Sequence, residues 1–153
     1  IQALLLLSEI AAFYKEKGQT LFDAIESIYE EFGYFEEKTI SVTMSGMSGV
    51  EKIQQLMADI RSNIPTSFAD VAVNYYEDYD AQLRQYISGE SEKLVLPTSN
   101  VLKFFLTDGS WIAIRPSGTE PKVKFYLGVK GNSHEETKEK IAKFEEVVQQ
   151  FVK

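Results

Sequence analysis

Apolar residues at helical spacing dominate the first 33 residues of the chain. The first apolar stretch is followed by Gly18, a residue type that commonly ends helices. Thr20 then has the character of an N-cap, and Asp23 lies in the first turn of a second apolar stretch that runs to Gly33. The pattern predicts two helices. They are more apolar than two solvated helices should be, so we expect them to be buried against other protein.

After Gly33 the pattern changes to alternation, which is typical of strands with one buried face. Asp108 and Gly109 lie between two alternating runs, and this arrangement predicts a hairpin with a type I′ turn. Residues 77–99 are polar and predict a long loop with a short extended piece at 94–96. We predict strands over residues 39–44, 71–76, 101–107, 111–115 and 123–129.

Two further stretches return to helical spacing. The first covers residues 50–63, after a turn at 45–49 in which Ser48 is the expected N-cap. The second is opened by the capping-box pair Ser133 and Glu136. Its predicted inner face consists of Ile141, Phe144, Val147, Val148 and Phe151. The order of elements predicts an α+β fold, in which an antiparallel sheet of four to five strands is covered by helices on one face and preceded by a helical pair.

Composition excludes several classes of protein. The net charge is −7 and the pI is about 4.8, so the chain lacks the basic footprint of a nucleic-acid binder. Cysteine is absent and His134 is the single histidine, which excludes disulfides, thiolate metal sites and multi-histidine sites. The opening apolar run is shorter than the ~20 residues that span a bilayer, and no basic leader precedes it. We therefore expect no membrane partner and no signal peptide, and a cytoplasmic location.

The charge is unevenly distributed along the sequence. Residues 101–130 hold five basic and two acidic side chains, although the chain as a whole is acidic. A cationic segment in an acidic protein predicts a local anion site rather than a track for a polyanion.

The segment R-P-S-G-T-E-P-K, residues 115–122, lies between two predicted strands inside this cationic region. Arg115 offers a planar fork of donors that suits two phosphate oxygens at once. Ser117 and Thr119 add hydroxyl donors, and Gly118 lets backbone N–H groups approach an anion closely. The two prolines partly fix the shape of the loop. The segment predicts a phosphate-binding loop, and an ordinary polar hairpin turn is the alternative interpretation.

Three neighbours of this loop have less obvious roles. Lys122 and Lys124 raise the local positive potential, and Glu120 could orient Arg115 or meet a sugar hydroxyl.

Other polar features favour structural interpretations. The turn at 45–49 could bind an anion at a helix N-terminus, but turn-plus-cap is the commoner use of such a stretch. Glu77, Asp78 and Asp80 lack the spacing of a calcium loop, so we expect a solvated acidic loop. His134 is expected to be exposed, and no serine, cysteine or second histidine accompanies it as a catalytic partner. Tyr75, Tyr76 and Tyr79 could stack on bases or sugars, although a strand edge is the more usual setting.

The loop and its flanks resemble a known family. R-P-S-G-T-E-P-K followed by V-K-F-Y, and the preceding N-V-L-K-F-F-L-T-D-G-S-W-I-A-I, resemble the phosphate-binding region of the α-D-phosphohexomutases of the phosphoglucomutase/phosphomannomutase type. The resemblance implies that residues 1–37 are the helical tail of the third domain of such an enzyme. It implies that residues 38–153 are its C-terminal, fourth domain, with a fold like that of the TATA-box-binding protein. It also implies that domains N-terminal to this sequence are partners.

The family resemblance implies a reaction and a role for this part. Such isomerases, which are intramolecular phosphotransferases, move a phosphoryl group between the C1 and C6 oxygens of a sugar phosphate. They use a phosphoserine, Mg²⁺ and a hexose bisphosphate. Arg115, Ser117, Gly118 and Thr119 match the residues that grip the non-reacting phosphate of glucose or mannose phosphate, and Lys122 occupies the last place of the motif. The phosphoserine, metal and sugar loops are missing from the sequence, so we expect no catalytic group and no metal or other cofactor site within it.

Two alternatives remain at the level of sequence. The chain could belong to a phosphopentomutase or a hexosamine-phosphate mutase, which share R-x-S-G-T-E-P, or it could be a stand-alone module that binds a phosphometabolite. Because Ile1 rather than Met opens the chain, we expect it to have been trimmed from a longer protein. The apolar residues at 1–33 then predict self-association of the isolated chain.

Overall fold

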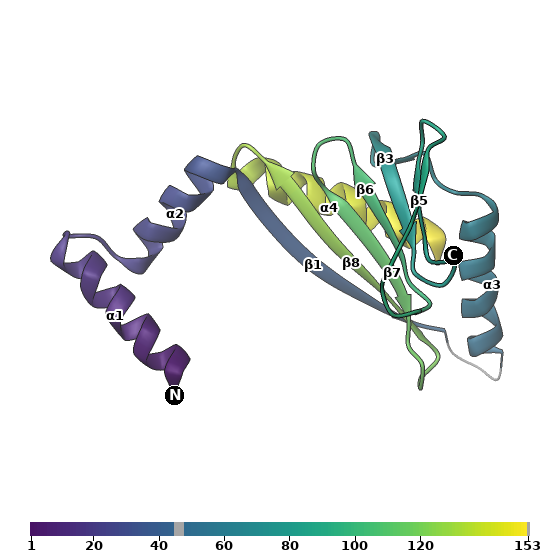
Figure 1. Cartoon of the computed structure of the whole chain (residues 1–153), viewed down its shortest axis with the longest axis horizontal. Helices are drawn as coiled ribbons and strands as arrows, with labels where there is room; N and C mark the ends of the chain where they lie inside the picture. Colours follow the sequence, from purple (N-terminus) through teal and green to yellow (C-terminus); the bar gives the residue numbers. More distant parts are fainter. Residues whose placement is uncertain (45–47, 153) are drawn as a thin grey trace.

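The chain folds into a helical arm and an α+β body, which Figure 1 shows side by side. A computed structural model describes residues 1–44 and 48–152. We call residues 1–33 the arm, which consists of α1 (Gln2–Glu16) and α2 (Leu21–Phe32), and residues 34–152 the body. None of the described helices has the length and apolar content needed to cross a membrane.

Local signals place the ends of the arm helices where the sequence predicts them. The Thr20 hydroxyl accepts a hydrogen bond from the Asp23 N–H, and the Asp23 carboxylate accepts one from the Thr20 N–H at 2.7 Å. This reciprocal pair satisfies two backbone groups that would otherwise lack partners at the start of α2. Gly18 and Gly33 follow the two helices with φ of 72° and 99°, a backbone region that favours glycine.

The described part of the body contains one antiparallel sheet of eight strands. In spatial order its main path is β1-β8-β7-β6-β3-β4-β5, and β2 pairs with β3 outside that path. The strands are β1 (Tyr34–Thr43), β2 (Ser67–Phe68), β3 (Val71–Asp78), β4 (Leu83–Tyr86), β5 (Ser91–Lys93), β6 (Leu102–Leu106), β7 (Trp111–Pro116) and β8 (Lys122–Gly131).

Two helices, α3 (Gly49–Ser62) and α4 (His134–Phe151), cover one face of this sheet. Their inward side chains include Met57 and Phe144, which form one core cluster with Phe104 and Phe125 of the strands, all four at most 1% exposed. The inner face that the sequence predicts for the last helix is confirmed, since Ile141 and Val148 are also buried there. The opposite face of the sheet carries no helix among the described residues (Figure 1).

The α+β class and the one-sided helical cover are confirmed, but the predicted number of four to five strands is wrong. Two of the unpredicted strands, β4 and β5, lie within residues 77–99, which we expected to form a loop. Their sequences lack apolar alternation, and no residue of either strand is fully buried. Ion pairs add to the backbone pairing of these strands. Arg84 lies opposite both Glu77 and Glu92 and bonds their carboxylates at 2.6 and 3.1 Å. Residues 94–96 are not a strand.

Two local predictions need correction. Gly109 has φ of 87°, whereas Asp108 does not have positive φ, so the hairpin turn is not of type I′. The N–H of Gly109 bonds the Leu106 carbonyl, and the N–H of Leu106 bonds the Ser110 carbonyl, the pattern of a type I turn followed by a glycine bulge. Ser48 occupies the N-cap position of α3 but makes no side-chain cap bond. Residues 45–47 of the predicted turn lie outside the described residues.

The predicted solvated acidic loop is wrong for two of its three acids, since only Asp80 is exposed. Glu77 and Asp78 are 4% and 7% exposed, at the end of β3. Asp78 accepts hydrogen bonds from the Arg61 guanidinium at 2.8 and 3.2 Å. Burial alone would raise the pKa of Asp78. The hydrogen bonds from Arg61 and from the Ala81 N–H together outweigh burial, so the pKa lies below its ordinary value. These acids are structural partners of arginines.

Candidate functional site

The connection between β7 and β8 places the cationic loop at one end of the sheet. Arg115 lies near the end of β7, directly opposite Lys124 on β8. Their chain neighbours Ile114, Val123 and Phe125 are fully buried on the core side. Because side chains alternate along a strand, Arg115 and Lys124 lie on the face that the helices leave open.

Four of the five sequence-predicted site residues line one hollow of about 290 Å³. The residues that line it are Arg115, Pro116, Ser117, Gly118, Thr119, Lys124 and Tyr126. The Arg115 side chain makes no hydrogen bond or ion pair with any residue in the described part of the chain. Its guanidinium is therefore available to an anion, with the Lys124 side chain beside it.

Few internal bonds hold the tip of the loop. The N–H of Ser117 bonds the Lys122 carbonyl at 2.8 Å, and the N–H of Lys122 bonds the Glu120 carbonyl at 2.7 Å. The N–H of Thr119 lies 3.5 Å from the Ser117 hydroxyl oxygen, a weak contact. Within the described residues, the N–H groups of Gly118 and Glu120 have no acceptor. Free N–H groups in a turn are suited to binding an anion.

Glycine at position 118 is not required by the packing of the protein itself. A Cβ there would meet no atom within 4 Å, and Gly118 does not have positive φ. Gly49 is the opposite case, because a Cβ there would lie 2.1 Å from the Met44 carbonyl oxygen and 3.0 Å from Pro121. The sequence prediction that Gly118 makes room for a ligand remains open, whereas Gly49 is required by the close packing of α3 against the base of the loop.

The base of the loop is better supported than its tip. The N–H of Met44 bonds the Pro121 carbonyl at 2.9 Å and so connects the loop to the end of β1. A second hollow of about 210 Å³ lies along Ser117 and Gly118, with Gln54 of α3 and Asn100 among its other lining residues. The supported base and less constrained tip leave the donor groups of the tip free for a ligand.

Lys122 differs from the other predicted site residues. Its ammonium lies 3.2 Å from the Glu120 carboxylate, and it does not line the hollow. The predicted contact between Glu120 and Arg115 is absent among the described side chains, since Glu120 pairs with Lys122.

Sequence reasoning missed Tyr126 and assigned Lys124 only a contribution to the local potential. Both line the hollow, and their signal was the two-residue period of β8, which puts residues 122, 124 and 126 on one face. Which of these three reaches the loop depends on the β7–β8 register, and the sequence does not state that register.

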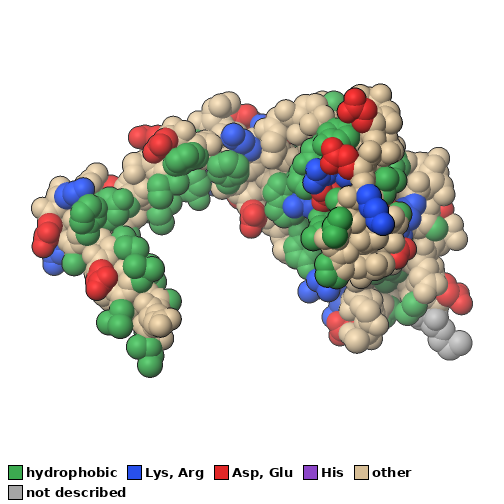
Figure 2. Space-filling view, in the orientation of Figure 1, with side chains coloured by type: hydrophobic (Ala, Val, Ile, Leu, Met, Phe, Trp, Pro, Cys, Tyr) green, Lys and Arg blue, Asp and Glu red, His purple; other side chains and the backbone are tan. Residues whose placement is uncertain are grey.

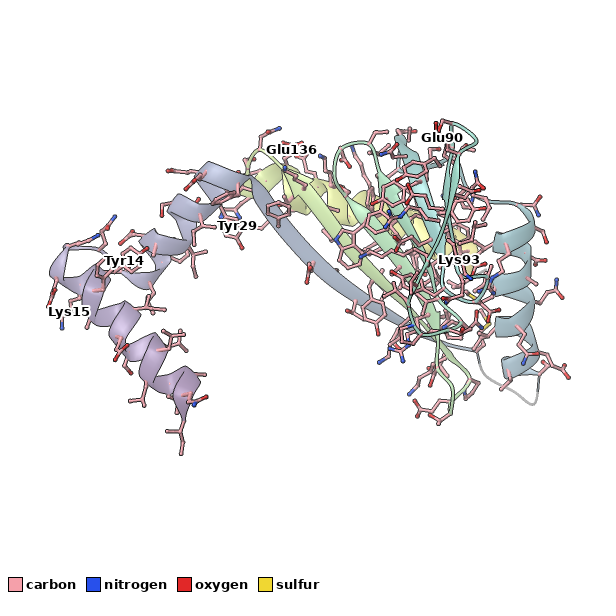
Figure 3. All side chains as sticks on the ribbon, viewed as in Figure 1. Tyr14, Lys15, Tyr29, Glu90, Lys93 and Glu136 are labelled. Carbon is pink, nitrogen blue, oxygen red and sulfur yellow. The ribbon has the colours of Figure 1, made fainter. Side chains whose placement is uncertain are left out.

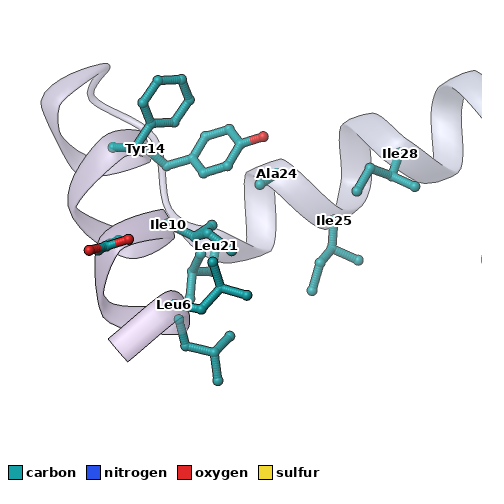
Figure 4. A pocket seen from close by; sticks show the side chains of 10 residues that line it. Leu6, Ile10, Tyr14, Leu21, Ala24, Ile25 and Ile28 are labelled. Carbon is teal, nitrogen blue, oxygen red and sulfur yellow. The ribbon is translucent and has the colours of Figure 1, made fainter. Parts of the chain in front are cut away.

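A larger hollow, of about 630 Å³, lies in the arm between α1 and α2, far from the loop in sequence (Figure 4). Its lining is apolar, as the labelled Leu6, Ile10, Leu21, Ile25 and Ile28 illustrate, and Glu9 is its single charged residue. Such a lining offers no chemistry for an anionic ligand. It has the character of a packing surface.

The remaining candidates are structural. His134 is not exposed as expected: it is half-buried, and its Nε2 lies 3.1 Å from the Glu26 carboxylate. Tyr75 stacks on Phe105 with ring centroids 4.4 Å apart. No group of three or more histidine or acidic side chains that could hold a metal ion occurs in the described part of the chain.

Comparison with known proteins places this geometry in context. Residues 42–148 match the family described as "Phosphoglucomutase/phosphomannomutase, C-terminal domain". A protein named phosphoglucomutase from Staphylococcus saprophyticus is 36% identical over 152 residues, 99% of this chain and 26% of the relative. Proteins of the same name from Staphylococcus haemolyticus and Staphylococcus aureus are 37% and 35% identical over 142 residues, 92% of this chain. The chain thus spans about a quarter of the length of the curated relatives it matches.

Proposed function

The chain belongs to the phosphoglucomutase/phosphomannomutase family, as a C-terminal domain with a helical arm, and from this premise we propose that its 115–126 hollow grips the phosphate of a hexose phosphate. The observation that carries the proposal is that one small hollow is lined by the two side-chain cations Arg115 and Lys124, by Ser117 and Thr119 with their hydroxyls, and by Gly118 with its free N–H group. A phosphate needs these donors on several sides, and the fork of Arg115 can bond two of its oxygens.

The chemistry that this part of the protein supplies is binding and orientation. Held by its non-reacting phosphate, a sugar phosphate has its reacting end fixed at a set distance from the loop. Binding energy from a remote group can then support the reaction at the other end. The relatives' name favours glucose phosphate as the ligand, and mannose, pentose and hexosamine phosphates are the competitors to compare.

For the whole protein we propose the interconversion of hexose 1-phosphate and hexose 6-phosphate, an isomerase reaction by intramolecular phosphoryl transfer with a hexose bisphosphate as activator. We propose that the Mg²⁺ of the whole enzyme binds outside the described residues, which bring no three acidic or histidine side chains together. No step of the reaction is therefore assigned to a metal on this chain. The lack of cysteine is compatible with a cytoplasmic protein, since disulfides are rare in that compartment.

The arm fits the same proposal. Leu4, Leu7, Phe13 and Phe22 are all more than half exposed, and Figure 2 shows apolar side chains gathered along the arm. Exposed apolar surface of this extent is typical of an interface. We infer that this surface packs against other domains of the mutase.

The binding test compares three single substitutions, Arg115→Ala, Lys124→Ala and Lys122→Ala. Arg115→Ala removes a charged contact worth about 1.5–3 kcal/mol, so the Kd for glucose 1-phosphate should rise roughly 10- to 150-fold. Lys124→Ala should weaken binding by a smaller factor, because lysine supplies a point charge rather than a fork. Isothermal titration calorimetry measures all three variants.

Lys122→Ala is the matched control, because it removes the same residue type from the same strand two positions away. Its Kd should stay within about threefold of the parent value, since Lys122 pairs with Glu120 outside the hollow. A weakening as large as that of Lys124→Ala would restore the sequence prediction for Lys122. An unchanged Kd in a folded Arg115→Ala variant would refute the phosphate grip.

A further inference from the structure

The face of the sheet that the helices leave open continues beyond the phosphate hollow. Arg115 of β7 lies opposite Lys124 of β8 at the hollow. The next pair of residues on the same face is Ala113 with Tyr126, and Tyr126 also lines the hollow. In Figure 3 the labelled Tyr14 of α1 lies away from the strands, so α1 does not cover this face. A ligand held in the hollow therefore has neighbouring sheet surface against which it can lie.

Ala113 forms the floor of a shallow depression in this face. It is 9% exposed, yet it does not belong to the core cluster, whereas its chain neighbours Ile112 and Ile114 do. Tyr126 and Lys103 lie opposite Ala113 on the two adjacent strands, so these longer side chains flank its methyl group. A small side chain between two long ones leaves room for part of a ligand.

Trp111 bounds the depression at the end away from Arg115. A Cβ at Gly128, which lies opposite Trp111 on β8, would be 2.3 Å from two atoms of the indole, so the indole lies directly over that glycine. The Lys103 ammonium is 4.4 Å from the centroid of the Trp111 ring, a cation–π contact. Contacts on two sides thus hold the indole before any ligand binds. We call the four residues of this surface the shelf: Ala113, Tyr126, Lys103 and Trp111.

The chemistry of the shelf suits a sugar ring. Small-molecule sites are mostly apolar with a few polar groups, and the shelf combines a methyl group and two aromatic side chains with one ammonium group. A pyranose ring presents C–H groups on its faces and hydroxyls around its edge, so it can contact both kinds of group. From Arg115 to Trp111 the strand advances four residues, roughly 13 Å at ~3.3 Å each, which gives room for a phosphate followed by one six-membered ring.

We propose that the shelf contacts the sugar ring of the ligand whose phosphate occupies the hollow, and that Ala113 and Tyr126 determine the preference for a sugar phosphate over other phosphate esters. The assignment rests on the proposed function of the hollow. Arg115 and Lys124 bind the phosphate of any such ester, whereas the shelf distinguishes esters that carry a ring. It adds a contact on the ring and leaves the ring accessible to the rest of the mutase.

The test compares glucose 1-phosphate with methyl phosphate, a phosphate monoester that has no ring. Amide NMR titration of the 153-residue chain gives both Kd values. In the parent chain we expect the Kd for methyl phosphate to exceed that for glucose 1-phosphate by about fivefold or more. Ala113→Leu, which fills the depression, should abolish this preference while the Kd for methyl phosphate stays within about threefold of the parent value.

Two substitutions at one position test the aromatic contact. Tyr126→Ala should lower the preference about threefold or more, because it removes a ring that packs against the sugar. Tyr126→Phe keeps the ring and should keep the preference. Ala72→Leu is the matched control for Ala113→Leu, because it makes the same change at an exposed position of β3 in the same sheet. Circular dichroism checks that each variant is folded.

Equal Kd values for the two ligands in the parent chain would overturn the shelf, as would a parent-like preference in a folded Ala113→Leu variant. An equal weakening of both ligands in that variant would also overturn it, because the change would then act on the hollow. If Ala113→Leu does not fold, the comparison of Tyr126→Ala with Tyr126→Phe decides the question. The phosphate grip itself fails only if Arg115→Ala leaves methyl phosphate binding unchanged, so the two failures are distinguishable.

Discussion

The arm and the body use the same apolar residue types with opposite results. In the body, aromatic and aliphatic side chains from strands and helices close into one core, in which Phe104, Phe125 and Phe144 are fully buried. In the arm, α1 buries no residue and α2 buries only Ala24. Helical spacing therefore predicts a helix, but the spacing does not show whether the surface that covers the helix lies among these residues.

The largest expected effect separates the two regions by stability. Phe144→Ala removes a side chain that is 0% exposed and should lower the free energy of unfolding by about 3–5 kcal/mol. Phe13→Ala on α1 removes a side chain that is 52% exposed and should cost less than about 1 kcal/mol. Urea unfolding, followed by fluorescence of the single tryptophan, Trp111 in β7, measures both values. Equal losses would show that the arm is buried in solution.

A smaller effect concerns self-association of the isolated chain. The apolar surface of the arm should produce concentration-dependent association, which Leu6→Glu at the α1–α2 hollow should weaken. Leu96→Glu in the body is the control, because Leu96 is 49% and Leu6 57% exposed. Sedimentation velocity compares the three proteins. A parent chain that stays monomeric at high concentration would contradict the prediction.

The sequence predicts those parts of the fold that depend on neighbouring residues. The capping pair at Thr20 and the hairpin around Gly109 are examples, since each depends on residues only a few positions apart. Strands β4 and β5 were missed because the pairs of Arg84 with Glu77 and Glu92 replace apolar alternation there. The type I′ turn was wrong because Asp-Gly also suits a type I turn with a glycine bulge.

The candidate site also combines residues that are neighbours in the sequence with residues that only the fold brings together. Arg115, Ser117, Gly118 and Thr119 are contiguous, so their motif could be read from the sequence, and the structure brings them together. Tyr126 lines the hollow because of the register between β7 and β8, which cannot be read from the sequence alone. The contact between Glu26 and His134 joins residues 108 positions apart, and no local sequence pattern predicts it.

The claim that the body carries a phosphate grip and the arm does not is tested most directly by an amide NMR titration of the chain. Glucose 1-phosphate, glucose 6-phosphate and inorganic phosphate are added in turn. We expect saturable shifts at residues 115–126, larger for a sugar phosphate than for phosphate, and no shifts in the arm. Unchanged amides at 115–126 at high ligand concentration, or shifts confined to the arm, would contradict it.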